Sequence, residues 1–169
     1  MLFRSPGEQL AQRRTERRAT ASGQRVETFV SDEWTLEYDL AFHGLGKQVY
    51  RGASLALADD ALNAGGAVQS EVIEAADAAY QALADAGHDR ETLGSHIYAL
   101  FEAEGASKAI AAQYLAELLE KEVETGTLTV LQLLQLLPPY VVAAIAHVTA
   151  PFPGPDPNGA AAQIGRAHV

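Results

Sequence analysis

Four carboxylates lie close together near residue 35, in the stretch SDEWTLEYDLAFHGLGK over residues 31–47. They are Asp32, Glu33, Glu37 and Asp39. We expect a helix to begin near Asp32 or Thr35. Glu33 and Glu37 would then share one face and repel each other by about 0.2–0.5 kcal/mol. A divalent ion such as Mg²⁺, which takes one or two carboxylates beside water and phosphate oxygens, would offset that repulsion. Helix capping is the alternative, and it needs no metal.

A lysine in the first turn of a predicted helix is the second chemical signal. The segment GASKAIAAQYLAELLEK places Ser107 at the helix cap and Lys108 directly after it. A cation there opposes the helix dipole, at a cost of about 0.3–1 kcal/mol, so we expect a compensating anion. A phosphate would satisfy both Lys108 and the free backbone N–H groups, and such a lysine stabilises charge in phosphodiester cleavage. An ion pair with Glu102 or Glu104 is the alternative.

Other catalytic motifs are absent from the sequence. GLGK at residues 44–47 is not a phosphate-binding loop, because Ala41 and Gln48 stand where glycine and serine or threonine are required. The chain has no cysteine, and its five histidines lack metal-ligand spacing, so a metal would need oxygen ligands. No apolar run reaches the roughly 18–20 residues that span a bilayer, and no secretory signal begins the chain. We therefore expect a cytoplasmic protein without membrane contact.

The charge of the chain is uneven. The net charge of −10 argues against general nucleic-acid binding, which depends on cations that neutralise phosphates. The first 25 residues nevertheless hold six of the 12 basic residues: Arg4, Arg13, Arg14, Arg17, Arg18 and Arg25. Arg13, Arg14, Arg17 and Arg18, together with Ser107, are candidate contacts to phosphate or DNA. A solvated helix face is the alternative for the arginines.

Length and composition predict one domain, and periodicity predicts a predominantly helical α/β fold. We expect a basic helix within residues 1–24, a short strand over 25–30 where valine and threonine alternate, and alanine-rich helices broken by glycines thereafter. In total we predict one or two short strands and about six helices over 25–150. Pro138 and Pro139 mark a boundary before a buried helix.

The proline-rich tail, 151–169, is expected to be disordered. Its last six residues, 164–169, match one translated frame of a common sequencing adapter, which predicts that the gene was cut there.

Three segments together resemble the C-terminal half of the TOPRIM nuclease domain of OLD-family ATP-dependent endonucleases. They are VETFVSDEWTLEYDLA, SKAIAAQYLAELL and LPPYVVAAIAHV, and they occur in the family's order between about residues 25 and 150. The resemblance implies that Glu37 is a metal-binding glutamate and that Lys108 is the catalytic lysine. Asp32, Glu33 and Asp39 match less clearly, so we expect them to support the metal ligands or cap the helix.

The implied activity is cleavage of DNA by two divalent ions, Mg²⁺ or Mn²⁺, about 3.5–4 Å apart. ATP would be bound by a separate ABC-type ATPase. The family's earlier glutamate strand and D-x-D strand have no counterpart before residue 25, so we predict a C-terminal fragment that is weak or inactive alone. Its partners would be DNA, the ATPase, the first half of the TOPRIM domain and a second copy. The alternative is a noncatalytic helical interaction or dimerisation module, in which Glu37 and Lys108 have no special role.

Overall fold

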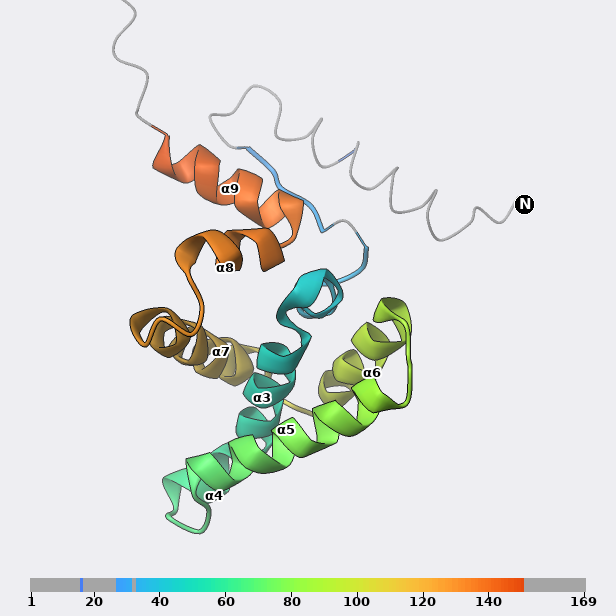
Figure 1. Cartoon of the computed structure of the whole chain (residues 1–169), viewed down its shortest axis with the longest axis vertical. Helices are drawn as coiled ribbons and strands as arrows, with labels where there is room; N and C mark the ends of the chain where they lie inside the picture. Colours follow the sequence, from blue (N-terminus) through green and yellow to red (C-terminus); the bar gives the residue numbers. More distant parts are fainter. Residues whose placement is uncertain (1–15, 17–26, 32, 151–169) are drawn as a thin grey trace, which may run out of the picture.

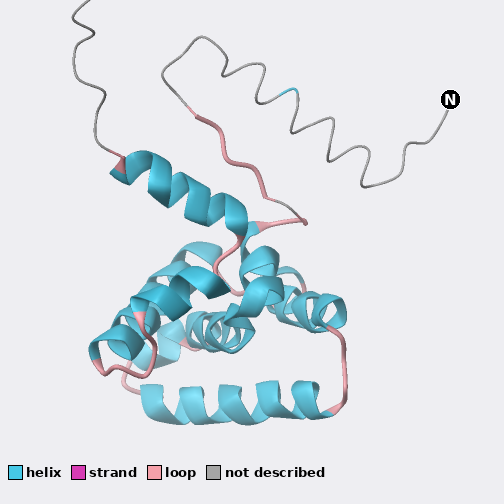
Figure 2. Ribbon diagram, turned by 45° about the horizontal axis from the view of Figure 1, so that its top comes forward, coloured by secondary structure: helices cyan, strands magenta, loops and turns pink. Residues whose placement is uncertain are grey.

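The described part of the chain is helical. The computed structural model describes residues 16, 27–31 and 33–150, and Figures 1 and 2 show helices joined by short loops over most of them. The elements are α2 (Leu36–Leu40), η1 (Ala41–Leu45), α3 (Gly46–Leu57), α4 (Asp59–Asn63), α5 (Gln69–Asp85), α6 (Arg90–Glu102), α7 (Lys108–Glu124), α8 (Val130–Leu136) and α9 (Pro139–Thr149). The prediction of a predominantly helical chain is therefore confirmed.

The strand predicted over residues 25–30 is not found in its described part. Residues 27–31 follow an irregular course, and the described residues include no strand. An alternating segment needs a neighbouring edge for its backbone hydrogen bonds. No such edge exists within residues 27–31 and 33–150, so the α/β part of the fold prediction is not supported. Asp32, Arg13, Arg14, Arg17, Arg18 and the tail 151–169 lie outside the described residues.

Local signals set the ends of the later helices. The Ser107 side chain accepts a hydrogen bond from the Ile110 N–H at 3.4 Å and begins α7. Gly105 lies between α6 and α7 with a φ of 80°, a conformation that favours glycine. Leu137 and Pro138 are extended and separate α8 from α9, as the paired prolines predict.

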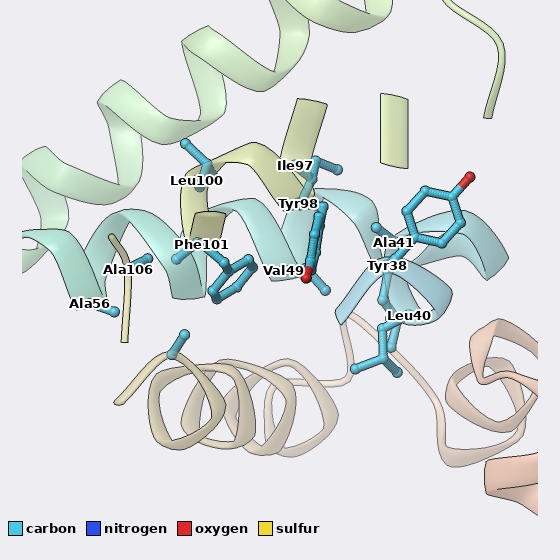
Figure 3. Close-up of a cluster of buried hydrophobic side chains, with 13 residues drawn as sticks. Tyr38, Leu40, Ala41, Val49, Ala56, Ile97, Tyr98, Leu100, Phe101 and Ala106 are labelled. Atoms are coloured by element: carbon cyan, nitrogen blue, oxygen red, sulfur yellow. The ribbon is translucent and has the colours of Figure 1, made fainter. Parts of the chain in front are cut away.

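Helix α3 lies at the centre of the fold. Figure 1 shows it between α6 and α7, with α5 crossing beside it, and it contacts all three. Leu45, Leu55 and Ile97 are fully buried. Figure 3 shows side chains from α2, α3 and α6 meeting in the same core. A Cβ at Gly52 would lie 3.0 Å from the Ala111 carbonyl oxygen, so glycine lets α3 and α7 approach closely.

A group of charged side chains joins α3, α5 and α7. The Arg51 guanidinium donates hydrogen bonds of 2.6 and 2.7 Å to the Asp77 carboxylate and one of 3.0 Å to Glu122. Lys47 approaches Asp77 at 3.1 Å, and the Gln48 amide donates to Glu122 at 3.1 Å. The hydrogen bonds from Arg51 lower the pKa of Asp77, and Asp77 in turn raises the pKa of Arg51. We call this group the Arg51 clamp.

Helices α8 and α9 lie at the edge of the molecule. Leu133, Leu136 and Leu137 pack against the core, whereas no residue of α9 is fully buried. The prediction of a buried helix after Pro139 is therefore wrong, because the side chains that reach the core in this region come from α8 and the residue that follows it, and not from α9. Over residues 27–31 and 33–150, no helix combines the length and apolar content needed to cross a bilayer.

Candidate functional site

Glu37 and Lys108 lie together in the structure. Glu37 is in the first turn of α2, Lys108 is the first residue of α7, and 71 positions separate them in the sequence. The Lys108 ammonium Nζ lies 3.4 Å from Glu37 Oε2. The Lys108 side chain is 45% exposed and that of Glu37 is 21% exposed. The pair is therefore partly shielded by protein but open to a ligand from solvent.

Glu37 is the compensating anion for the lysine at the start of α7. The sequence left Glu102 and Glu104 as candidates for this role. In the structure, Glu102 instead accepts a 2.7 Å hydrogen bond from the Tyr98 hydroxyl. The unfavourable position of Lys108 in the first turn is thus offset by a carboxylate from another helix.

One aromatic ring borders Lys108, and a second ring packs against the first. Lys108 Nζ lies over the Tyr98 ring, 5.0 Å from its centroid, in the range of a cation–π interaction. The Trp34 ring packs against Tyr98 at a centroid distance of 4.5 Å, and Trp34 is 56% exposed. Burial lowers the pKa of Lys108, but the Glu37 carboxylate and Tyr98 outweigh that effect and raise it above its ordinary value. The ammonium is therefore held in its charged form.

Asp39 holds the turn that precedes the site. It is fully buried, and its carboxylate accepts hydrogen bonds from the Ser31 hydroxyl at 2.8 Å and from the Trp34 N–H at 3.0 Å. The Glu33 N–H makes a longer contact of 3.4 Å to the same carboxylate. Asp39 therefore holds the turn that precedes α2, and the chain itself supplies hydrogen-bond donors to its carboxylate.

The predicted repulsion between Glu33 and Glu37 does not occur on a helix. Thr35 is the N-cap of α2, its side chain accepts from the Tyr38 N–H at 3.4 Å, and Glu33 precedes the helix. The two glutamates therefore do not share a helix face, and that argument for a metal is wrong. The structure gives Glu33 an exposed position in the turn.

A small cavity of about 50 Å³ lies beside the Glu37–Lys108 pair. Its other lining residues are seven apolar side chains: Leu36, Leu40, Val49, Phe101, Ala111, Ala112 and Leu115. Helices α2, α3, α6 and α7 each supply at least one of them. The site therefore combines an apolar cavity with one ammonium and one carboxylate.

The described residues do not fit a complete metal centre. Over residues 27–31 and 33–150, no three side chains of histidine, aspartate or glutamate come together in an arrangement that could hold an ion. Glu37 is engaged by Lys108, and Asp39 is occupied by the turn. The two-metal site that the resemblance implies would need ligands beyond these residues.

Comparisons with known proteins give no relative. No family model matches the chain, and no match is found among curated proteins or solved structures. The OLD-type resemblance therefore stays a prediction that depends on the residues themselves. Ser107 caps α7, and its contact to phosphate also stays a prediction.

Sequence reasoning missed the aromatic surroundings of Lys108. Tyr98 lies in a helix whose apolar spacing, at Leu93, Ile97 and Phe101, indicates a core face and nothing more. Trp34 is the one tryptophan in the chain and directly precedes the capping threonine. The position of Trp34 next to a helix cap was the one available sequence signal for an aromatic residue near the site. The contact of Trp34 with Tyr98 could not be predicted from it, because that contact depends on how α2 and α6 pack.

Proposed function

We propose that this chain is the lysine-bearing C-terminal part of a metal-dependent DNA endonuclease of OLD type, which works with an ABC-type ATPase and is weak or inactive alone. The observation that carries the proposal is the 3.4 Å approach of Lys108 to Glu37. These are the two residues to which the resemblance gives catalytic and metal-binding roles. Their convergence from separate helices supports a common site.

The proposal places a phosphate at the start of α7. Lys108 carries a positive charge at the start of α7, where the first backbone N–H groups have no acceptor within the helix. A phosphate oxygen placed there accepts hydrogen bonds from the ammonium and from those N–H groups. During phosphodiester cleavage the same donors stabilise the charge that develops on the phosphate. Glu37 and the Tyr98 ring keep the ammonium charged and in place.

Divalent ions would activate water and stabilise the leaving oxygen in such an enzyme. Glu37 is the described carboxylate that the proposal assigns to them. Because the described residues do not form a complete metal centre, the proposal predicts little cleavage by the 169-residue chain. Strong nicking of supercoiled plasmid with Mg²⁺ or Mn²⁺, abolished by Lys108→Ala, would contradict the predicted inactivity.

Phosphate binding can be tested on the chain itself. It has three lysines, Lys47, Lys108 and Lys121, so ¹³C-methylation of the lysine amines gives a simple NMR spectrum. Titration with a single-stranded oligonucleotide at low salt should shift the Lys108 signal. Glu37→Gln should enlarge that shift at equal oligonucleotide concentration, because it removes the carboxylate that competes for the ammonium.

Lys121 is the matched control, since it lies exposed near the end of the same helix. Equal shifts at Lys121 and Lys108 would indicate nonspecific attraction and contradict a phosphate site. An unchanged Lys108 signal would contradict it as well. Resequencing the source DNA with long reads across both ends of the gene would then show whether a D-x-D strand and an ATPase are encoded upstream.

A noncatalytic helical module is the second candidate, and the apolar side chains exposed on α8 and α9 favour it. Calorimetry with Mn²⁺ separates the two functions. Heat of binding that is lost in Glu37→Ala, but kept when the exposed Glu74 is changed to alanine, supports the nuclease. No heat, together with a tight dimer, supports the module.

A further inference from the structure

The cavity beside Glu37 and Lys108 has a charged rim and an apolar floor. Both charged residues line the cavity, and their side chains are partly exposed. Leu40, Val49 and Phe101 line the same cavity and are buried. Sites for small molecules typically have this composition, with an apolar lining and a few polar groups that orient the ligand. A phosphate bound to Lys108 would leave the apolar floor unused, so the nuclease proposal does not account for the floor.

The volume of the cavity limits the apolar group that it can hold. An engineered apolar cavity of about 150 Å³ binds benzene, which has six carbon atoms. On that scale, the cavity of about 50 Å³ holds two or three carbon atoms. Its floor offers water few hydrogen-bond partners, so a small aliphatic group is favoured there over water. A three-carbon isopropyl group is within this limit, whereas a benzyl group exceeds it.

The two charges at the rim determine the other groups of the ligand. Lys108 Nζ and Glu37 Oε2 lie 3.4 Å apart and pair with each other. A ligand that carried a carboxylate alone would pair with Lys108 and draw it away from Glu37. Leaving one of two partly shielded charges without its partner is unfavourable. A zwitterion avoids this cost, because it supplies an anion to Lys108 and a cation to Glu37.

A free α-amino acid combines these features, since its ammonium, its carboxylate and its side chain are all attached to one carbon atom. We infer that the cavity binds an α-amino acid with a small aliphatic side chain, such as valine. The carboxylate of the ligand pairs with Lys108, its ammonium pairs with Glu37, and its side chain enters the apolar floor. A peptide satisfies the site less well, because its two charged ends are attached to different residues.

Calorimetric titration of the full chain with L-valine tests the inference. For a ligand of this size we expect a Kd of about 0.1–2 mM. Isovalerate lacks the ammonium of valine, isobutylamine lacks its carboxylate, and glycine lacks its side chain. Each of the three should bind at least about tenfold more weakly than valine. L-Phenylalanine should also bind more weakly, because its side chain exceeds the cavity.

Ala112→Leu tests whether the side chain of the ligand enters the cavity. Ala112 lines the cavity and is exposed, so leucine at this position fills the opening without disturbing the core. The substitution should raise the Kd for valine at least about tenfold while leaving circular dichroism unchanged. Ala116→Leu is the matched control, because Ala116 is exposed on the same helix, one turn further along and outside the cavity lining. It should leave the Kd unchanged.

Three results would each overturn the inference: no binding of valine up to about 20 mM, equal affinities for valine and isovalerate, or an unchanged affinity for valine in Ala112→Leu. The inference does not rest on the nuclease proposal, and Glu37→Gln separates the two. This substitution should weaken valine binding, because it removes the partner of the ligand's ammonium, whereas it should enlarge the response of Lys108 to an oligonucleotide. The chain can therefore bind valine without a phosphate site at Lys108, or the reverse.

Discussion

Asp39 is the residue whose removal should disturb the candidate site most directly. Its buried carboxylate accepts from Ser31 Oγ at 2.8 Å and from the Trp34 N–H at 3.0 Å. A hydrogen bond to a charged group contributes about 1.5–3 kcal/mol, and the cost of burying the carboxylate offsets part of the sum. We therefore expect Asp39→Ala to lower the free energy of unfolding by about 2–4 kcal/mol. In a chain of this size, the melting temperature should fall by about 5–15 °C.

Thermal and urea unfolding followed by circular dichroism would measure this loss. Trp34 is the only tryptophan, so its fluorescence reports separately on the turn before α2. Asp60→Ala, at an exposed position in α4, is the control and should change stability by less than about 0.5 kcal/mol. A cost below about 1 kcal/mol for Asp39→Ala, with unchanged Trp34 emission, would refute the role assigned to Asp39.

Two further substitutions test the fold around α3. Arg51→Met should cost about 2–3 kcal/mol by removing three charge-assisted hydrogen bonds. Arg51 lowers the pKa of Asp77. The stability that the Arg51–Asp77 interaction contributes is therefore complete above the ordinary aspartate pKa of 3.8 and is lost as pH falls below that value. Urea unfolding should therefore show that the difference in free energy of unfolding between Arg51→Met and the unchanged chain shrinks below that pH. A difference that stays constant with pH would contradict the role of the Arg51–Asp77 interaction. Gly44→Ala should cost about 1–3 kcal/mol, because φ is 140° and its Cβ would lie 2.6 Å from Leu136 Cδ2. Gly66→Ala should lower the free energy of unfolding less, because a Cβ at Gly66 would lie 3.6 Å from its nearest neighbour, the Ala61 carbonyl oxygen. Equal effects of the two substitutions on urea unfolding would contradict the conformation at Gly44.

The helices could be predicted because their signals are local. Ser107 lies where a cap is needed, and Gly105 and the paired prolines lie where helices end. Alternation over residues 25–30 is also a local signal, but a strand forms only when a second strand is available. Periodicity cannot supply that information, and the described residues contain no such partner. The strand prediction failed for this reason.

The geometry of the candidate site could be predicted only in part. The residue types predicted metal binding for Glu37 and phosphate binding for Lys108. Their 3.4 Å contact could not be predicted, because 71 positions separate the two residues in the sequence. Asp39 was recognised as a capping candidate, whereas its complete burial depends on hydrogen-bond donors from the preceding turn. The Arg51 clamp was missed because its three helices are brought together by packing, which no local pattern records.

Helix α3 connects both halves of the candidate site. Glu37 is linked to α3 through α2 and η1, where Gly44 sets the change of direction. Lys108 is linked to α3 through α7, which approaches Gly52 closely near its start and is bound by Arg51 near its end. Because α3 thereby fixes the helices that carry both charges, the distance between the ammonium and the carboxylate is a property of the whole helical core. The clamp and the glycine contact therefore stabilise the site without touching it.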